Sequence, residues 1–557
     1  MEKSGYYDLR YEPWIPFRRR SGEIVWGAPS LLTEGLTSDN PITDIAAPRP
    51  DFNAALQEFL IGLLAVTFAP QDDDEWLELW NEPPDEARHR QALERLPDAF
   101  YLLGKGPRFF QDLNEDDLSA DVDGVDGLLI DSAGEQGKRL NKDLFVKRDR
   151  FKSFGRPAAA MALLTLQTYA PAGGQGHRVS LRGGGPLTTL VDPRVAIDPA
   201  GSAFSMPLWQ KLCANVPTEM QFRRSKSAAK SEYEKIFPWL APTRSSKDKA
   251  AADTLPQHGH PLQCFFGMPK RIRLESVRQE GVCSLTGYPG AEMIIGYRST
   301  NYGVKYTGWR HPLSPYYKDP EGSFLPKHPK SGTLLWKEWL SLMLRDPDER
   351  FAPAQCVSNF LGVRGPLIRV RRFRLSVLGY ETDNAKACSW LQADVPAFSF
   401  PAKKSDLVWR VMNALTSATD IAAQATVRSV KEGLIGERKG VKIDLGLVSR
   451  AVWGGTEAHF KSVLERLSAD DLPEDAEIAI PQGFVEPLKL VALSAFDEAC
   501  PLEGIEHAAV KRVVAARYTL SGTLRGVTAD GRRLFEALKL AVPDTAKGKK
   551  QSKKKGV

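Results

Sequence analysis

Residues 406–423 read Asp-Leu-Val-Trp-Arg-Val-Met-Asn-Ala-Leu-Thr-Ser-Ala-Thr-Asp-Ile-Ala-Ala. Apolar side chains recur there every three or four residues, at Leu407, Val411, Leu415, Ala418 and Ala422. Because an α-helix completes a turn in about 3.6 residues, this spacing places them on one face, which must be buried against other elements. The stretch therefore predicts a long amphipathic helix.

The same spacing returns three more times downstream. It is found at Phe460-Val463-Leu464-Leu467, Leu488-Val491-Ala492-Phe496 and Val510-Val513-Val514-Arg517. Several such helices joined by short loops are typical of an antiparallel bundle, so we expect a C-terminal bundle of the four-helix type over residues 401–525. Residues 526–557 are expected to form an extension whose Lys-rich end, after Asp544, cannot bury a core and is disordered.

The first 400 residues have a different texture. Tyr7 to Trp26 reads as a β-hairpin with a basic turn, and Phe52 to Phe68 as a buried helix. Residues 264–310 read as short strands separated by turns. We therefore expect an α+β protein: a large mixed domain of short sheets and helices over residues 1–400, followed by the bundle.

Composition and cysteine usage limit the class of protein. The chain has 557 residues, a formal charge of +6 and six isolated cysteines without a CxxC pair, which fits a reducing cytoplasm and provides no disulfide framework. The most apolar helix candidate, Phe52 to Pro70, contains Asn53, Gln57 and Glu58 and so predicts a buried helix. We expect a cytoplasmic protein with no membrane partner.

Motifs of common catalytic chemistry are absent from the sequence. There is no GxxxxGK[ST] phosphate loop, no HExxH metal signature and no GxSxG nucleophile elbow, and the eight histidines are scattered. We therefore expect no catalytic residues, no metal site and no cofactor. A nucleic-acid-processing enzyme with an unrecognised site remains the alternative.

The clearest positive feature is a pair of glycine-rich runs. Ala172-Gly-Gly-Gln-Gly-His-Arg178 is followed by Arg182-Gly-Gly-Gly-Pro186. Glycine has no Cβ, so such a loop can approach a ligand closely with its backbone N–H groups turned outward. Arg178 and Arg182 are the predicted phosphate contacts. A plain flexible turn is the alternative interpretation.

Five segments, in order over roughly residues 7–525, resemble the CasA family, the large subunit of the type I-E CRISPR Cascade complex. They are Trp14-Ile-Pro16 before the basic turn, Leu181 to Val191, Trp309 to Pro315, Gly379 to Ala385 and Ala515 to Leu520. The resemblance implies a subunit that cuts nothing itself. It would read the motif beside a target in double-stranded DNA, mainly from the minor groove, start strand separation and help to recruit a helicase-nuclease. Guide pairing would read the remaining sequence.

The resemblance also implies partners and site residues. Expected partners are the 5′ handle region of the guide RNA, the target DNA, the helicase-nuclease effector and the backbone, small and handle-binding Cascade subunits. The family's glycine loop maps onto Gly173, Gly174, Gln175 and Gly176. The family's wedge glutamine falls at Asn384, between Asp383 and Ala385, and a short amide there would insert beneath the first base pair.

Three further family features map less directly. The lysine finger falls at the uncharged Thr300, so Arg298 is the preferred cation and Lys305 the alternative. Phe145 and Lys147 are the expected contacts to the guide-RNA handle and its holder subunit, with core packing as the alternative for Phe145. Zinc-binding family members use two cysteine pairs, of which only Cys283 is present here, so no zinc is expected. A structural scaffold that binds only RNA also remains open.

Overall fold

The structure is a computed structural model. It describes residues 6–141, 143, 148, 150–173, 176–193, 206–222, 230–248, 252–330, 336–383, 386–400, 404–436, 443–469, 472–503 and 507–542. The chain divides into two compact units, each of which the chain enters twice. The first comprises Met1–Ser331 and Arg345–Ala397, and the second Gly332–Leu344 and Phe398–Val557.

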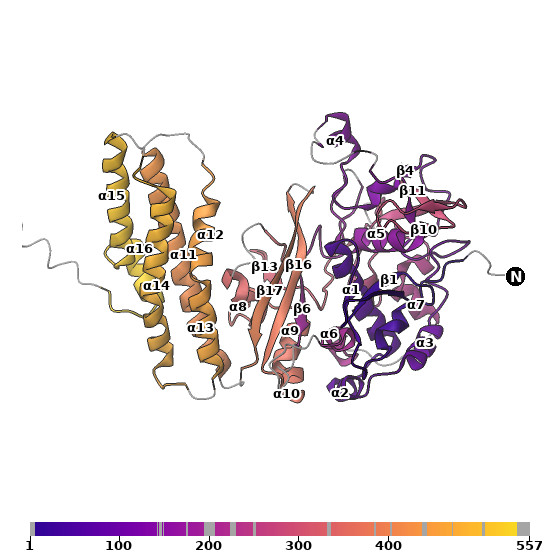
Figure 1. Ribbon diagram of the computed structural model, residues 1–557, viewed down its shortest axis with the longest axis horizontal. Helices are drawn as coiled ribbons and strands as arrows, with labels where there is room; N and C mark the ends of the chain where they lie inside the picture. The colour runs from indigo at the N-terminus through magenta and orange to yellow at the C-terminus, as the bar shows by residue number, and fades with distance from the viewer. Residues whose placement is uncertain are drawn as a thin grey trace, which may run out of the picture. The chain divides into compact units, whose positions relative to one another are not determined.

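Two long helices form the centre of the first unit. α1 (Pro50–Thr67) and α5 (Arg156–Tyr169) pack against each other, and nearly every α5 side chain is buried (Figure 1). Each begins with a proline in its first turn, where the fixed φ suits a helix and no N–H partner is lost. The prediction of a buried helix near residues 52–68 is confirmed. The other helices of the first unit are shorter: α2 (Asp73–Asn81), α3 (Glu86–Glu94), α4 (Glu135–Arg139), α6 (Leu208–Cys213), α7 (Lys230–Ile236), α9 (Gln355–Asn359) and α10 (Gly365–Leu367).

The strands of the first unit form several small sheets. One has the order β2-β1-β3, and β1 and β2 are the predicted N-terminal hairpin. In another, β11 lies between β4 and β5 and also pairs with β8. A third has the order β17-β16-β6 and contains two long strands that form one hairpin (Figure 1). The strands of these sheets are β1 (Ile15–Arg19), β2 (Ile24–Gly27), β3 (Ile42–Ile45), β4 (Asp123–Gly124), β5 (Phe154–Gly155), β6 (Thr188–Asp192), β8 (Arg271–Val277), β11 (Met293–Thr300), β16 (Arg372–Asp383) and β17 (Lys386–Phe398). The smaller sheets are formed by β7 (Asp253–Thr254), β9 (Gly281–Val282), β10 (Pro289–Gly290), β12 (Lys305–Tyr306), β13 (Tyr316–Lys318), β14 (Phe324–Pro326) and β15 (Phe351–Ala352).

The second unit is helical. Its longest helix, α11 (Ser405–Ile435), packs against five others of this unit and corresponds to the opening sequence stretch (Figure 1). The other helices are α8 (Trp339–Met343), α12 (Gly446–Gly455), α13 (Glu457–Ser468), α14 (Ala476–Ala499), α15 (His507–Leu524) and α16 (Ala529–Ala537). The predicted α+β class with a C-terminal helical bundle is confirmed.

Two parts of the helical unit lie outside the residue range expected for it. Trp336, before residue 400, stacks on Phe460 with ring centroids 4.7 Å apart, and its Nε1 donates to the Trp453 carbonyl at 2.8 Å. Beyond residue 525, α16 packs against α11 and buries Leu534. The bundle therefore includes short apolar segments that come before and after the expected range in the sequence. The Lys-rich tail lies outside the described residues.

Among the described helices, one is long and apolar enough to cross a membrane by length and composition. It is α14, rather than the segment from Phe52 that the sequence pointed to. α14 carries Pro481 and Pro487, buries Phe484 and Phe496, and packs against α11, α12 and α15. These contacts make it a core helix of the bundle.

Candidate functional site

The first glycine run ends against the chain that leaves β11. The carbonyl of Gly176 accepts a 2.9 Å hydrogen bond from the Tyr302 backbone N–H. Gly176 has a φ of +79°, and a Cβ there would lie 3.0 Å from the Cβ of Asn301. Only glycine adopts this positive φ without strain and leaves Asn301 where it is. The run and the end of β11, where Thr300 lies, are therefore neighbours.

A lysine that the sequence did not single out lies under the start of the same run. Lys270 Nζ donates a hydrogen bond to the carbonyl of Pro171 at 3.1 Å. Burial of this ammonium lowers its pKa to about 8. Together with burial, its charge lowers the pKa of His177. The structure thus places a partly buried cation beside the glycine run.

The second glycine run connects the first run to the β16–β17 hairpin. A Cβ on Gly184 would lie 3.3 Å from the Cα of Pro171. A Cβ on Gly185 would lie 2.6 Å from both the Cβ and the carbonyl oxygen of Tyr380, and 3.2 Å from Thr382 Cγ2. The base of the first run and the hairpin therefore pack on opposite sides of two adjacent glycines.

The hairpin is held on the body of the first unit by aromatic and charged groups. Tyr380 packs edge-on against Tyr169 and Trp390, with centroids 6.2 and 4.9 Å away. Its hydroxyl donates to the buried carboxylate of Asp51 at 2.6 Å, and Arg49 completes this contact. Burial and the Asp51 charge raise the pKa of Tyr380, which stays a neutral donor. The strand that leads to position 384 is thereby fixed.

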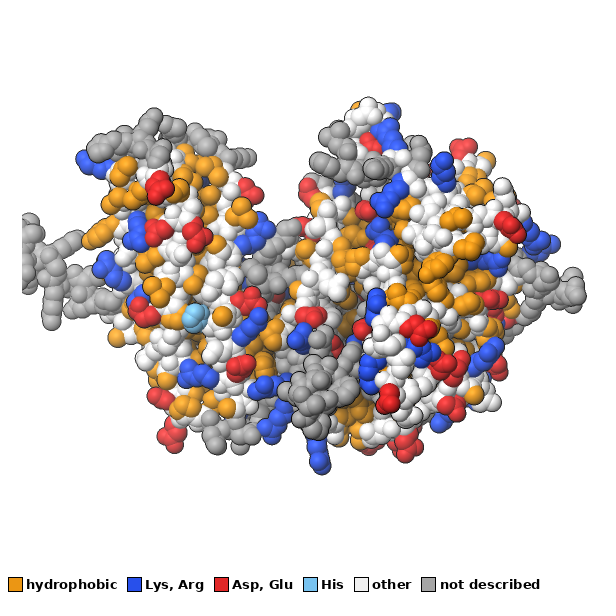
Figure 2. Space-filling model, in the orientation of Figure 1, with side chains coloured by type: hydrophobic (Ala, Val, Ile, Leu, Met, Phe, Trp, Pro, Cys, Tyr) orange, Lys and Arg blue, Asp and Glu red, His pale blue; other side chains and the backbone are white. Residues whose placement is uncertain are grey.

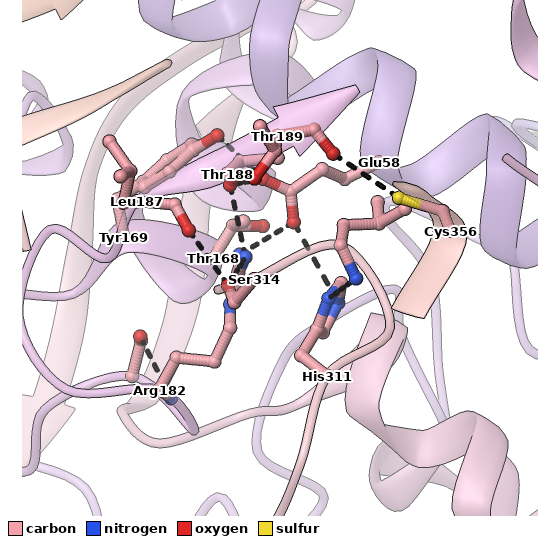
Figure 3. Close-up of polar contacts among 12 residues, drawn as sticks. Glu58, Thr168, Tyr169, Arg182, Leu187, Thr188, Thr189, His311, Ser314 and Cys356 are labelled. Atoms are coloured by element: carbon pink, nitrogen blue, oxygen red, sulfur yellow. Dashed lines mark hydrogen bonds and ion pairs between the residues drawn. The ribbon is translucent and has the colours of Figure 1, made fainter. Parts of the chain in front are cut away.

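Arg182, at the start of the second glycine run, belongs to a buried polar cluster (Figure 3). Glu58 Oε1 accepts from the Tyr169 hydroxyl at 2.6 Å and from Thr188 Oγ1 at 2.7 Å, while its Oε2 accepts from the Arg182 guanidinium at 2.5 Å. Arg182 also donates to Thr188 and Ser314, each at 3.0 Å. His311 lies 3.8 Å from Glu58, and burial together with the Arg182 charge lowers its pKa well below the ordinary value, so it is neutral. We call these six residues the Glu58 cluster.

The two arginines expected to contact phosphate have different surroundings. The Arg182 side chain is only 3% exposed and its charge is balanced by Glu58. This contradicts the accessibility that a phosphate contact requires, because a phosphate would have to displace buried partners. The Arg182 prediction is therefore corrected to a structural role. Arg178 is half-buried and donates to Ser246 Oγ at 2.7 Å.

The candidate replacements for the lysine finger both take part in ion pairs. Arg298 Nε lies 2.5 Å from Glu275 Oε1, and the two side chains are about equally half-exposed at 30% and 28%. Lys305 Nζ lies 2.7 Å from Asp253 Oδ1 and is more exposed. Arg298 is on β11, two residues before Thr300, on the strand that runs to the glycine loop. Arg298 thus lies near Thr300, where the lysine finger was expected, and its contact with a DNA minor groove remains a prediction.

Several expected site residues lie outside the described residues. They are Phe145, Lys147, Gly174, Gln175, Asn384 and Ala385. Their neighbours are described: Gly173 is exposed, and Asp383 is exposed at the end of β16. The roles of the residues outside the described ranges remain predictions.

The segments that would carry zinc ligands meet in the fold but lack the donors. A Cβ on Gly155 would lie 3.6 Å from the Cβ of Cys283 and 4.0 Å from its Sγ. Across the described residues no group of three or more His, Cys, Asp or Glu side chains could hold a metal ion. A structural zinc needs four ligands, so a single thiol at this junction does not fit one.

Side chains of both charge signs occur on each unit over the face in Figure 2, in agreement with a net charge of only +6. Binding of a polyanion would therefore depend on particular local groups. The region of the glycine runs has an exposed residue at Gly173, a cation at Lys270 and the end of β16, which Tyr380 holds in place. This geometry suits docking of a ligand's groove or edge.

Comparison with known proteins places this arrangement in context. A sequence model of the family described as CRISPR-associated protein Cse1 matches residues 8–483. The fold is similar to that of CasA from Thermus thermophilus, with a TM-score of 0.65 and 18% identity over 93% of this chain and 99% of that chain. It is similar to Cse1 from Thermobifida fusca, with a TM-score of 0.66 and 16% identity over 96% of this chain and 99% of that chain. It is also similar to a chain of a CRISPR RNA-guided surveillance complex, with a TM-score of 0.64 and 16% identity over 92% and 99% of the two chains.

Proposed function

Because this chain belongs to the CRISPR-associated Cse1 family, we propose that it is the large, non-catalytic subunit of an RNA-guided DNA surveillance complex. In this role it recognises a short motif beside the target in double-stranded DNA and starts strand separation. It acts in the cytoplasm with a guide RNA and the other subunits of the complex, and it helps to recruit a helicase-nuclease.

The observation that carries the proposal is the packing of Gly184 and Gly185. They hold the base of the glycine loop on one side and the strand toward Asn384 on the other. A loop poor in side chains suits the minor groove, which is narrow and presents a degenerate pattern. A short amide on a neighbouring braced hairpin suits insertion beneath the adjacent base pair. Both elements belong to one unit, so one docking event brings both to the duplex.

The proposed DNA-reading set combines expected and newly located residues. The loop contributes Gly173, Gly174, Gln175 and Gly176, and the hairpin contributes Asp383, Asn384 and Ala385. The cations are Arg298 on β11, Arg178 beside the loop and Lys270 under it. Phe145 and Lys147 are proposed to meet the guide-RNA handle and its holder subunit.

Reconstitution of the complex tests the proposal. Wild-type complex should bind a motif-bearing duplex more tightly than a motif-free duplex at the same salt concentration, since phosphate contacts alone cannot distinguish them. Gly174→Leu should weaken binding to the motif-bearing duplex and change motif-free binding little. Gly22→Leu is the control, because Gly22 lies in the turn between β1 and β2, away from the glycine runs, and a Cβ there meets no atom within 4 Å.

Two other functions predict different outcomes. A nuclease would cleave DNA when the isolated chain is incubated with a divalent metal, whereas we expect intact DNA. A scaffold that binds only RNA would keep the same affinity for both duplexes in every variant. Equal losses on both DNAs with Gly174→Leu would count against groove reading.

A further inference from the structure

The Glu58 cluster places two charged side chains in the interior of the first unit, where removing them from water costs free energy. Glu58 and Arg182 side chains are each 3% exposed, so both charges have been removed from water. Such a pair is no more stabilising than apolar side chains of the same size, unless its geometry and remaining hydrogen bonds are satisfied. Here Glu58 accepts three hydrogen bonds from three different residues, and Arg182 donates to three. This connected set of hydrogen bonds favours one arrangement of the cluster over alternatives.

The six members of the cluster come from five segments, since His311 and Ser314 share one loop (Figure 3). Glu58 lies on α1, Tyr169 ends α5, Thr188 begins β6, and Ser314 lies in the loop before β13. Arg182 alone comes from the turn 180–185, where the second glycine run begins. The cluster therefore fixes that turn relative to four parts of the core at once.

The turn 180–185 in turn contacts both proposed DNA-reading elements, the glycine loop and the hairpin. Ser180 N–H donates to the Ala170 carbonyl at 3.0 Å, and Gly185 N–H donates to the Tyr169 carbonyl at 3.1 Å. In the same turn, Gly184 packs on Pro171 and Gly185 packs on Tyr380. A change in the path of Arg182 would move the surface against which both the loop and the hairpin rest.

We propose that the Glu58–Arg182 ion pair is a positioning device for the DNA-reading site. It sets the turn 180–185, against which Pro171 at the base of the glycine loop and Tyr380 on the hairpin strand both rest. Neither charge touches DNA, and both act through Gly184 and Gly185. The inference rests on the proposed function and adds to it the residues that set its geometry.

The test compares variants inside and outside the cluster, in the assembled complex. Glu58→Gln keeps the shape and removes the charge, and Thr188→Val removes the hydroxyl that bonds both Glu58 and Arg182. Asp73→Asn is the matched control, because Asp73 pairs at 2.9 Å with Arg364, another buried arginine of the first unit. The readout is the ratio of affinities for motif-bearing and motif-free duplexes. We expect the ratio to fall at least tenfold for Glu58→Gln, less for Thr188→Val, and not for Asp73→Asn.

Hydrogen exchange of the full chain without DNA provides a second readout. Peptides covering 180–187 and 378–383 should exchange faster in Glu58→Gln and Thr188→Val than in the wild type or in Asp73→Asn. If Glu58→Gln does not fold, Thr188→Val decides the outcome by the same two measurements.

The possible results separate the two proposals. A wild-type complex without motif preference defeats the proposed function itself. A wild type with motif preference, together with folded cluster variants that keep its affinity ratio, overturns the positioning role. Equal losses in the cluster variants and in Asp73→Asn would overturn it as well, because they would show general destabilisation.

Discussion

Lys270 Nζ donates a 3.1 Å hydrogen bond to the carbonyl oxygen of Pro171, at the foot of the glycine loop. Burial disfavours the charged ammonium and lowers its pKa from 10.5 to about 8. The unfolded chain therefore binds more protons than the folded chain between about pH 8 and 10.5. Since stability rises with pH wherever the unfolded state holds more protons, this group destabilises the fold most below pH 8 and least above 10.5.

Lys270→Met should remove this pH dependence. The free energy of unfolding of the wild type should increase relative to that of the variant as the pH rises from about 8 to 10.5. Urea titrations of both proteins at several pH values measure the difference. Lys105→Met, at an exposed position, is the control for the loss of a lysine as such. A difference that is constant with pH would contradict the burial of the ammonium.

The close approach at Gly185 predicts a strong effect of one methyl group. Gly185 has a φ of +64°, which costs about 1–2 kcal/mol for alanine, and the new Cβ would also meet the backbone of Tyr380. Gly185→Ala should therefore destabilise the protein by more than this amount and shift the hairpin. In Gly22→Ala the φ of +92° gives the strain without a contact, so it isolates the first contribution. Thermal unfolding of the two variants gives the comparison, and equal losses would mean that Gly185 does not support the hairpin.

The sequence predicted the elements of this fold better than it predicted which segments meet. The spacing at Leu407 and Leu415 predicted α11, because a helix buries one face at a period that is local in sequence. Trp336 carries no such local signal, and its place on Phe460 depends on a contact between segments far apart in the chain. The bundle was therefore predicted without the segment that joins it from the earlier part of the chain.

The candidate site shows the same division. The glycine runs and the strand toward Asn384 were found from composition and from the family resemblance. Arg182 was expected to meet phosphate because it flanks the glycine-rich loop, yet Glu58, 124 residues away, holds it inside. Lys270 shows no motif, since its role follows only from the fold placing it under Pro171.

Arg298 provides a test of the cation at the end of β11. If it contacts the minor groove, Arg298→Ala should weaken binding to the motif-bearing duplex by about 1–3 kcal/mol. Glu275→Gln leaves Arg298 in place and removes its ion-pair partner, so it should preserve or strengthen binding. Lys305→Ala, on β12, serves as the comparison. Filter-binding titrations at constant salt give these affinities, and no loss with Arg298→Ala would move the role to Lys305 or remove it from both.

Trp336 should be essential for the helical unit. Its side chain is 5% exposed and makes both a ring stack and a hydrogen bond within that unit. Trp336→Ala should lower the free energy of unfolding by about 3–5 kcal/mol, in the range for buried aromatic truncations. Trp336→Phe should cost less, because it keeps a ring against Phe460 and loses only the N–H donor. Urea unfolding followed by helical circular dichroism measures both, and a near-neutral Trp336→Ala would place the segment outside the bundle.

Asn384 is expected to act after the duplex has been captured. The strand before it is held by the hydrogen bond from Tyr380 to Asp51, so the end of β16 can bear on DNA without moving away from the body of the first unit. Removing the amide in Asn384→Ala should therefore impair strand opening more than initial binding. Permanganate reactivity of thymines next to the motif reports opening, and duplex affinity reports capture. Asn384→Gln should retain opening, since it keeps the amide and lengthens it by one methylene. Loss of capture and opening in equal proportion would show instead that Asn384 belongs to the docking surface and that another group separates the strands.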